Sequence, residues 1–332
     1  MLHLLNHCIP RYFSLDDLNY RIGVFDLGRG ELSNRIPLVP SNYASKDKLK
    51  MSGSEMLSFC RFLGVLIGDR VPGHSNHWKL YLNLCELLDL CLSKRLSRKR
   101  NVTFKVLVQE FYSMYVSVTG DNLKPKMYFL LHYSTVFENC GPVDHMSTRR
   151  FASKHRTLTI PAHSTMSRKQ IAYTCALRHQ LVQSFRFLSR EPLAPRLEMG
   201  PSELVLLSEF DNFDSFKNSL PACIFMDKFT LSCDWVNISG TVYKPGMVLV
   251  INVSENGLVF GELQAIFVKD SNVVFVYRYF VTAGFNEHIH AYAISSSSKW
   301  GCKPAKDIFD HLPLYPHEDI SGDKYVVLRY CL

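Results

Sequence analysis

The stretch 247-MVLVINVSENGLVFGELQAIFVKDSNVVFVYRYFV-281 decides the class of fold in the C-terminal part of this chain. Its apolar residues repeat with a period near two, and it is rich in the β-branched and aromatic side chains that favour strands. The polar groups ENG and KDSN separate the runs and predict tight turns. Two more runs, HAYAIS and KYVVLRYCL, follow. The spacing predicts a small all-β domain, a barrel or a sandwich, over residues 233–332.

Upstream of this region the apolar pattern is that of helices. Residues 54–68, 78–92 and 103–118 each predict a helix, and the first two are apolar on nearly all sides. Such helices are expected inside a helical core. Residues 127–140 predict a buried strand or a short helix that ends at the following Gly-Pro. A long helix is expected over 167–190.

The long helix of 167–190 has two stripes of contrasting chemistry. Residues spaced by three and four positions share one face of a helix. The apolar stripe consists of Leu177, Leu181, Phe185 and Leu188, and the basic stripe of Arg178, Arg186 and Arg190. We expect the apolar stripe to close the helical region.

The two remaining segments are predicted to have less regular structure. Ser14 is placed to cap a short N-terminal helix that ends at Gly28 and Gly30, and an extended arm follows to residue 53. Residues 193–232 are acidic and rich in proline, which predicts a linker. The expected fold is therefore α+β, divided at 1–53, 54–192, 193–232 and 233–332.

Composition limits the class of protein. The chain has 332 residues, of which 47% are hydrophobic, and this is enough to build real cores. Its 10 cysteines occur singly within mostly apolar runs, which predicts buried free thiols in a reducing compartment. No apolar run is long enough to span a bilayer. There is no G-x-S-x-G, Walker A or G-x-G-x-x-G motif to support a hydrolase, an NTPase or a dinucleotide-binding enzyme.

Positive charge is concentrated in one segment. Residues 124–190 contain eleven Lys and Arg against two acids, Glu138 and Asp144, a local balance of +9 compared with +8 for the whole chain. A field this asymmetric is typical of a surface that binds polyanions. The alternative interpretation is an ordinary solvated charged face. The candidate nucleic-acid-binding residues are Arg149, Arg150, Lys154, His155, Arg156, Lys169, Arg178, Arg186 and Arg190.

A second basic run lies between two expected helices. It comprises Lys94, Arg95, Arg98, Lys99 and Arg100. The run fits a nuclear-import signal or a further phosphate contact, and it fits an exposed loop equally well.

Histidines and acids elsewhere invite other interpretations. His288 and His290 would project to the same side of a strand, with Glu287 nearby, but no third ligand stands at metal-site spacing. Packing or hydrogen bonding is the better interpretation of both, and we predict no metal site. Structural roles are also favoured for the acids on the apolar helices, Glu86, Asp89 and Glu110.

The order of several motifs resembles the C-terminal half of the CACTA-type (En/Spm-like) DNA transposases. In sequence they are YFSLDDLNYRI..FD.G from Tyr12, F.GVLIGD.VP from Phe62 with HW after it, LKPKMYFLLHY, GPV, RRFASKH and LRHQL. In the β region the patterns G..YKPG..LV......VFGEL, FNEH.HAY and YVVLRY resemble the small β domain of animal members. The resemblance covers almost the whole chain.

The resemblance implies a DNA cut-and-paste enzyme with an RNase H-like core, in which carboxylates hold two metal ions. The aspartate-bearing strands of the family precede the YFSLDDLN segment, and this chain starts about a dozen residues before it. The last family acid follows the Phe of the R-F-E-x-K-H motif, where this chain has Ala152. A methyl group cannot coordinate a hard cation such as Mg²⁺, which requires oxygen ligands.

These observations together predict a transposable-element-derived nuclear protein that associates with DNA through its phosphates, is catalytically inactive and needs no cofactor. Self-association is expected because the apolar helices at 54–68 and 78–92 would lack the partners that an RNase H-like sheet supplies. One alternative is an active Mg²⁺-dependent nuclease completed by another exon or subunit. A second alternative is a protein-interaction module that acts through its β domain.

Overall fold

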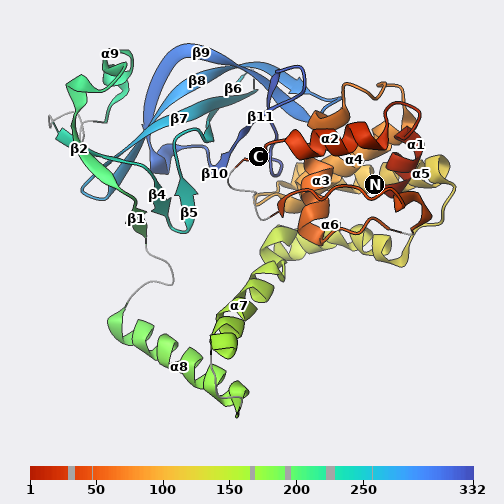
Figure 1. Ribbon diagram of the computed structural model, residues 1–332, viewed down its shortest axis with the longest axis horizontal. Coiled ribbons are helices and arrows are strands. Elements are labelled where there is room, and N and C mark those ends of the chain that lie inside the picture. Colours follow the sequence, from red (N-terminus) through yellow and green to blue (C-terminus); the bar gives the residue numbers. More distant parts are fainter. Residues whose placement is uncertain (29–33, 47, 165–168, 191–195, 222–228, 256) are drawn as a thin grey trace.

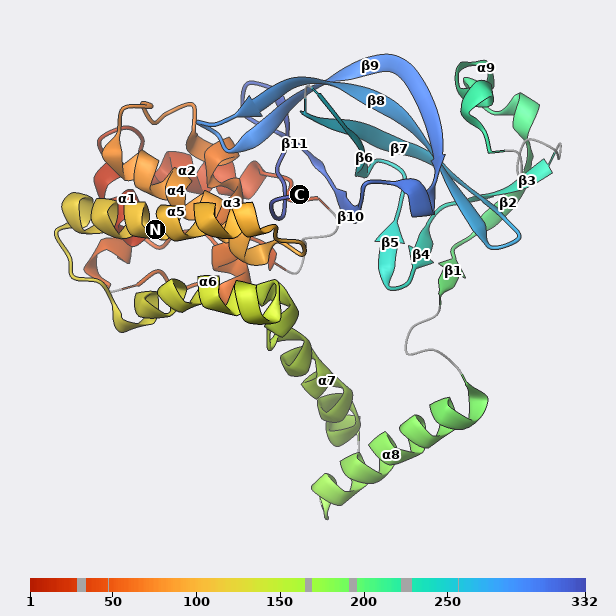
Figure 2. The ribbon, with the colours of Figure 1, turned by 180° about the vertical axis from the view of Figure 1, so that it is seen from behind.

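The computed structural model describes residues 1–28, 34–46, 48–164, 169–190, 196–221, 229–255 and 257–332 (Figure 1). A helical region is followed by a region of antiparallel sheet, which confirms the predicted α+β class. The two regions lie side by side, and a pair of helices projects away from both (Figures 1 and 2).

Four helices build the first core: α1 (Leu2–Cys8), α2 (Leu15–Val24), α3 (Gly53–Ile67) and α4 (Asn76–Leu92). As predicted, α3 lies within the core, and from Ser58 onward all of its residues except Arg61 are buried. A reciprocal Ser52–Glu55 capping box fixes its start. Ser14 caps α2 by accepting a hydrogen bond from the backbone N–H of Asp17 at 3.0 Å. This helix ends at Val24, four residues before the predicted stop at Gly28.

The next two helices form a second core with the far side of α4. They are α5 (Arg98–Thr119) and α6 (Tyr128–Cys140), and Phe104, Phe111 and Phe137 are buried between them. Residues 127–140 were predicted as a buried strand or a short helix, and they form a helix that is largely exposed. Gly141 ends it with a positive φ of 83°, a conformation that favours glycine.

The projecting helices are α7 (Arg149–Ser164) and α8 (Ile171–Ser189). The α8 helix confirms the long helix expected from the sequence. The α7 helix was not predicted, because β-branched Thr157, Thr159 and Ile160 disfavour helices and Pro161 lies inside it.

A large antiparallel sheet has the strand order β10-β6-β7-β8-β9-β12-β11. The strands are β6 (Val248–Ser254), β7 (Gly257–Lys269), β8 (Asn272–Asn286), β9 (Ala291–Pro304), β10 (Asp310–Leu314), β11 (Pro316–Glu318) and β12 (Lys324–Val326). Asp270 and Ser271 both have positive φ at the β7–β8 turn, as the twist of a two-residue hairpin requires.

The predicted barrel is wrong, because the described strands form an open sheet. After β9 the chain crosses to pair β10 with β6, and it then returns to pair β12 with β9. The last strands thus extend the two opposite edges of the sheet instead of joining them. Strand β3 (Phe229–Cys233) branches from β7 and pairs in turn with β2 (Ser202–Leu206).

The segment predicted as a linker contributes to the sheets. Besides β2 it holds β1 (Leu197–Met199) and the short helix α9 (Phe213–Phe216). Strand β1 pairs with β4 (Val236–Ile238), which pairs with β5 (Thr241–Tyr243). Short 3-10 turns complete the secondary structure at Tyr43–Ser45, Pro125–Met127, Val143–Met146, Leu207–Glu209, Lys217–Ser219 and Ala305–Asp307.

The tip of the β8–β9 hairpin reaches across and packs on the helical region. Ala291, Tyr325 and Val327 of the β region belong to the first core together with the residues of α1 to α4. The indole N–H of Trp78 donates to the backbone carbonyl of His288 at 3.0 Å. The apolar helices α3 and α4 therefore pack against the β region of the same chain, although their sequences led us to expect that they would lack packing partners.

The cysteines only partly match the prediction. Nine are described, and all of these are free thiols. Cys8, Cys60, Cys85, Cys233 and Cys302 are buried, whereas Cys140 is exposed. Cys223 lies outside the described residues. Among the described helices, none is both long enough and apolar enough to cross a membrane.

Candidate nucleic-acid interface

Helices α7 and α8 form an arm that extends from the end of α6, away from both cores (Figures 1 and 2). The α8 helix starts after Gln170 and stops before Arg190, both of which have left-handed backbone conformations. The Cys175 thiol donates to the carbonyl of Leu158 at 3.6 Å and links the two helices. We call α7 and α8 the basic arm.

The described basic residues of the arm are open to solvent. His155, Arg156, Lys169, Arg178 and Arg190 are exposed, and Arg186 is half-buried. The backbone of Arg149, Arg150 and Lys154 lies in α7, but the positions of their side chains are outside the described structure. The geometry thus places six of the nine candidate residues on one projecting element.

The sequence of the arm and the residues just before it contain no Asp or Glu. Residues 145–190 contain nine Lys and Arg, four His and no Asp or Glu. Glu138, just before this stretch, accepts hydrogen bonds from Asn101 at 2.9 Å and from Lys105 at 3.2 Å. Its charge is therefore directed towards α5, and within residues 145–190 no side chain neutralises the arginines.

A groove of about 860 Å³ lies between the two helices of the arm. Its lining combines apolar atoms with basic groups. The lining includes Thr157, Pro161, Cys175, Arg178, Val182 and Arg186. Sequence reasoning missed this groove because it requires α7, whose helical pattern is weak.

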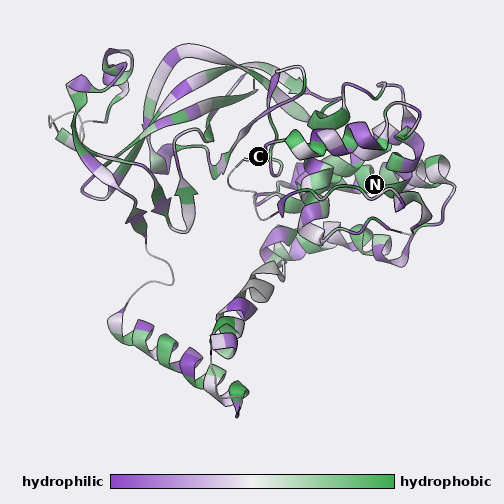
Figure 3. Cartoon of the chain, in the orientation of Figure 1, coloured by the Kyte–Doolittle hydropathy of each residue, from purple (hydrophilic) through white to green (hydrophobic). Residues whose placement is uncertain are grey.

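The apolar stripe of α8 does not close the helical region as expected. Leu177, Leu181, Phe185 and Leu188 are 45%, 60%, 60% and 85% exposed. Figure 3 shows hydrophobic and hydrophilic residues interspersed along the whole length of α8. The arm therefore exposes both apolar and cationic side chains to solvent.

The second basic run has structural contacts at the α4–α5 connection. Lys94 lies over the ring of Tyr330, 5.5 Å from its centroid, and Arg100 donates to the backbone carbonyl of Leu332. Arg98, Lys99 and Arg100 form the first turn of α5, which Ser97 caps. Part of the run therefore belongs to the start of α5, whereas the sequence placed all of it between two helices.

His288 and His290 lie in the β8–β9 turn, not on a strand as predicted. The ring Nε2 of His288 is 2.9 Å from the carbonyl of Gly68, and Nε2 of His290 is 2.8 Å from a carboxylate oxygen of Asp89. Both rings therefore attach the hairpin to the helices, which confirms the hydrogen-bonding interpretation. Among the described residues, no group of three or more His, Cys, Asp or Glu is arranged to hold a metal ion.

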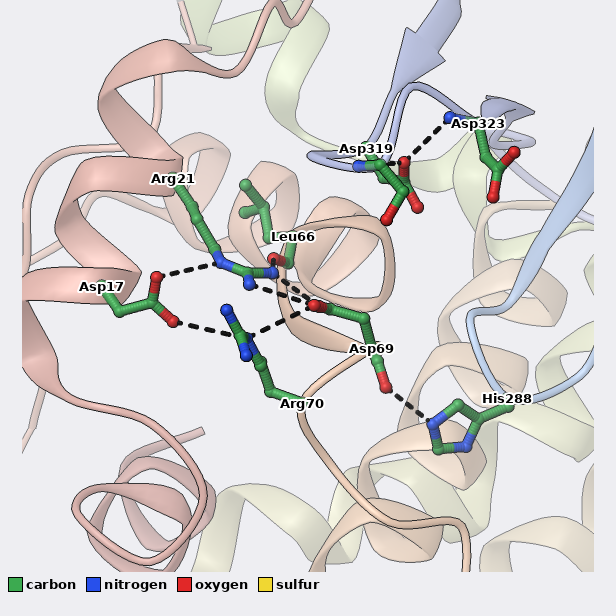
Figure 4. Close-up of polar contacts among 10 residues, drawn as sticks. Asp17, Arg21, Leu66, Asp69, Arg70, His288, Asp319 and Asp323 are labelled. Atoms are coloured by element: carbon green, nitrogen blue, oxygen red, sulfur yellow. Dashed lines mark hydrogen bonds and ion pairs between the residues drawn. The ribbon is translucent and has the colours of Figure 1, made fainter.

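A buried arginine organises the same side of the helical region (Figure 4). Arg21 is 2% exposed and makes two hydrogen bonds to Asp69, at 2.5 and 3.0 Å, one to Asp17 and one to the carbonyl of Leu66. Burial acts to lower the pKa of Arg21, but the bonds and charges of Asp69 and Asp17 outweigh it and raise the pKa. The motif residues Arg21 and Asp69 therefore have a structural role, tying α2 to the end of α3.

No protein-family model matches this chain, and no curated protein or solved structure matches it significantly.

Proposed function

We propose that this chain binds DNA through phosphate contacts made by the basic arm. The observation that carries the proposal is the stretch 145–190, in which nine Lys and Arg occur without one acid. The described members of this set lie on two projecting helices or directly beside the ends of α8, and they are mostly exposed. A cationic surface of this kind releases counterions from DNA on binding, and this supplies sequence-independent affinity.

We further propose that the protein derives from a CACTA-type transposase, acts in the nucleus and does not cut DNA. The support is the order of motifs that runs from Tyr12 to Tyr330. Ala152 replaces the last catalytic acid of that pattern, and the strands of the described structure all lie after residue 196. The described part of the helical region thus has no sheet on which metal-binding acids could converge.

The test of DNA binding is the salt dependence of affinity. In one variant Arg156, Arg178 and Arg190 are changed to Gln, and in a matched control Lys48, Lys50 and Lys306, which are exposed outside the arm, are changed to Gln. Fluorescence anisotropy with a labelled duplex should show a slope of log K against log salt that is smaller by up to about three in the arm variant.

The control should retain the wild-type slope and affinity. The arm variant should weaken binding to unrelated duplexes by the same factor, since phosphate contacts carry no sequence information. Equal losses in the two variants would show that total charge, and not the arm, governs binding. Wild-type protein without measurable affinity at low salt would refute the proposal.

A further inference from the structure

A cleft of about 380 Å³ lies where α4, α5 and the β8–β9 hairpin meet, apart from the basic arm. Most of its lining is apolar. The apolar lining residues include Leu90, Leu107, Leu258, Phe285, Tyr292 and Leu328. The lining also includes Glu86 and Asp89 of α4 together with His290 and Arg100.

Around Glu86 carboxylates outnumber cationic side chains, because Asp89, Glu110 and Glu287 all lie close enough to act on its charge. Arg100 and His290 each have a protein partner, the carbonyl of Leu332 and the carboxylate of Asp89. Glu86 has neither a hydrogen bond nor an ion pair within the described part of the chain. Partial burial raises the pKa of Glu86, His290 opposes the shift, and the charges of Asp89, Glu287 and Glu110 add to it. A cation brought close to Glu86 would relieve the crowding of carboxylates.

The C-terminal half of α8 has the complementary chemistry. Phe187 and Leu188 are 75% and 85% exposed, the highest values among the exposed large apolar residues that are described. Arg186 and Arg190 flank them in sequence. Apolar side chains this exposed indicate a surface that is covered in an assembly. Two basic arms would repel each other, so arm-to-arm pairing is disfavoured.

We propose that Phe187 and Leu188 of one copy insert into the apolar cleft of a second copy, with Arg186 and Arg190 beside Glu86 and Glu110. Charge complementarity selects this occupant, because the same chain holds both the acidic cleft and the basic apolar helix end. A reciprocal exchange of arms would close the assembly as a two-fold dimer. The inference goes beyond DNA binding and does not depend on it.

The first test measures self-association by sedimentation velocity on nucleic-acid-free protein over a range of concentrations. Changing Phe187 and Leu188 to Ser should weaken dimerisation by about tenfold or more, because the residues that fill the cleft are lost. A matched control changes Tyr20 and Val24 to Ser. These two side chains are 64% and 60% exposed on α2, and their loss should leave dimerisation unchanged.

The second test exchanges the charges. Changing Glu86 and Glu110 to Lys, or Arg186 and Arg190 to Glu, should each weaken dimerisation by about tenfold, and combining both changes should restore it. Open oligomers with the same pattern of weakening and rescue would equally support the contact. The proposal would be overturned if the wild type stayed monomeric at all concentrations. It would also be overturned if the variant that combines both charge changes dimerised no more tightly than the variants that carry one of them. The Phe187 and Leu188 variant keeps every positive charge, so it separates this contact from DNA binding.

Discussion

The backbone carbonyl of Ile289, at the tip of the β8–β9 hairpin, occupies the space that a Cβ on Gly64 of α3 would need. The hairpin thus approaches the helix as closely as backbone atoms permit. A Cβ on Gly68, one turn further along, would lie 3.1 Å from the side chain of the same Ile289. These two glycines create the surface on which the β region docks, and the hydrogen bonds of Trp78 and His288 hold it there.

Replacing Gly64 with Ala should therefore destabilise the protein by about 1–3 kcal/mol, since backbone atoms on both sides have to move apart. Chemical denaturation followed by tryptophan fluorescence provides the measurement. The control is Gly23→Ala in α2, where a Cβ meets nothing within 4 Å. There alanine should stabilise the helix by up to about 1 kcal/mol. Equal changes in unfolding free energy for Gly64→Ala and Gly23→Ala would contradict the close docking of the hairpin on α3.

Arg21 provides a prediction about the helical core itself. Changing Arg21 to Met should cost about 2 kcal/mol of unfolding free energy, less than for a fully buried pair because Asp69 stays 42% exposed. Arg21→Lys should also destabilise the protein, since an ammonium group cannot reproduce the bidentate contact with Asp69. Arg70→Met is the control, because this side chain is 50% exposed and its loss should cost less than about 0.5 kcal/mol. Equal losses for Met at positions 21 and 70 would show that the network contributes little.

Most of the local structure is readable from the sequence. The cap at Ser14, the apolar run of α3 and the turn within KDSN at Asp270 depend on nearby residues alone, and each is found close to the predicted place. The same holds for Gly261, because a glycine within a run of strand residues indicates either a bulge or a close approach of another group. A Cβ there would meet the ring of Tyr277 at 2.7 Å.

The predictions that fail concern contacts between residues far apart in the chain. A period of two predicts strands but not which edges pair, so β10 could not be assigned to β6 and the open sheet was taken for a barrel. The pairing of His290 with Asp89 joins residues 201 positions apart. In the candidate site the basic residues were found from charge alone, whereas the groove beside them needed α7, whose Pro161 conceals the helix.

A prediction about pH follows from the contact of α1 with α4. The rings of His7 and His77 stack with centroids 3.6 Å apart, and Arg11 and His3 lie near them. Burial lowers the pKa of both histidines, and positive neighbours add to this effect. In the pH range where these histidines titrate, the unfolded chain then binds more protons than the folded chain. The free energy of unfolding therefore rises with pH in that range.

The contribution of this pair is fully present above about pH 6.5 and is lost as the pH falls through the lowered folded pKa values. Thermal unfolding of wild type should show a lower Tm at pH 5.5 than at pH 7.5. His77→Gln should reduce that difference, and His74→Gln, an exposed neighbour, should not. A pH dependence unaltered by His77→Gln would assign the acid sensitivity to other groups. His3 is already paired with Asp121 at 3.0 Å, which partly offsets its charge.

The last prediction is that the purified protein does not cut DNA. Two-metal hydrolysis requires several carboxylates that converge so that the ions lie about 4 Å apart. The motif position of the last acid is Ala152, and Glu138 of α6 is engaged with Asn101 and Lys105. Supercoiled plasmid incubated with Mg²⁺ or Mn²⁺ should therefore stay intact. Ala152→Glu should not restore nicking, since one carboxylate cannot assemble the site. Metal-dependent nicking by the wild type that disappears in Glu138→Gln or Asp144→Asn would establish the nuclease alternative instead.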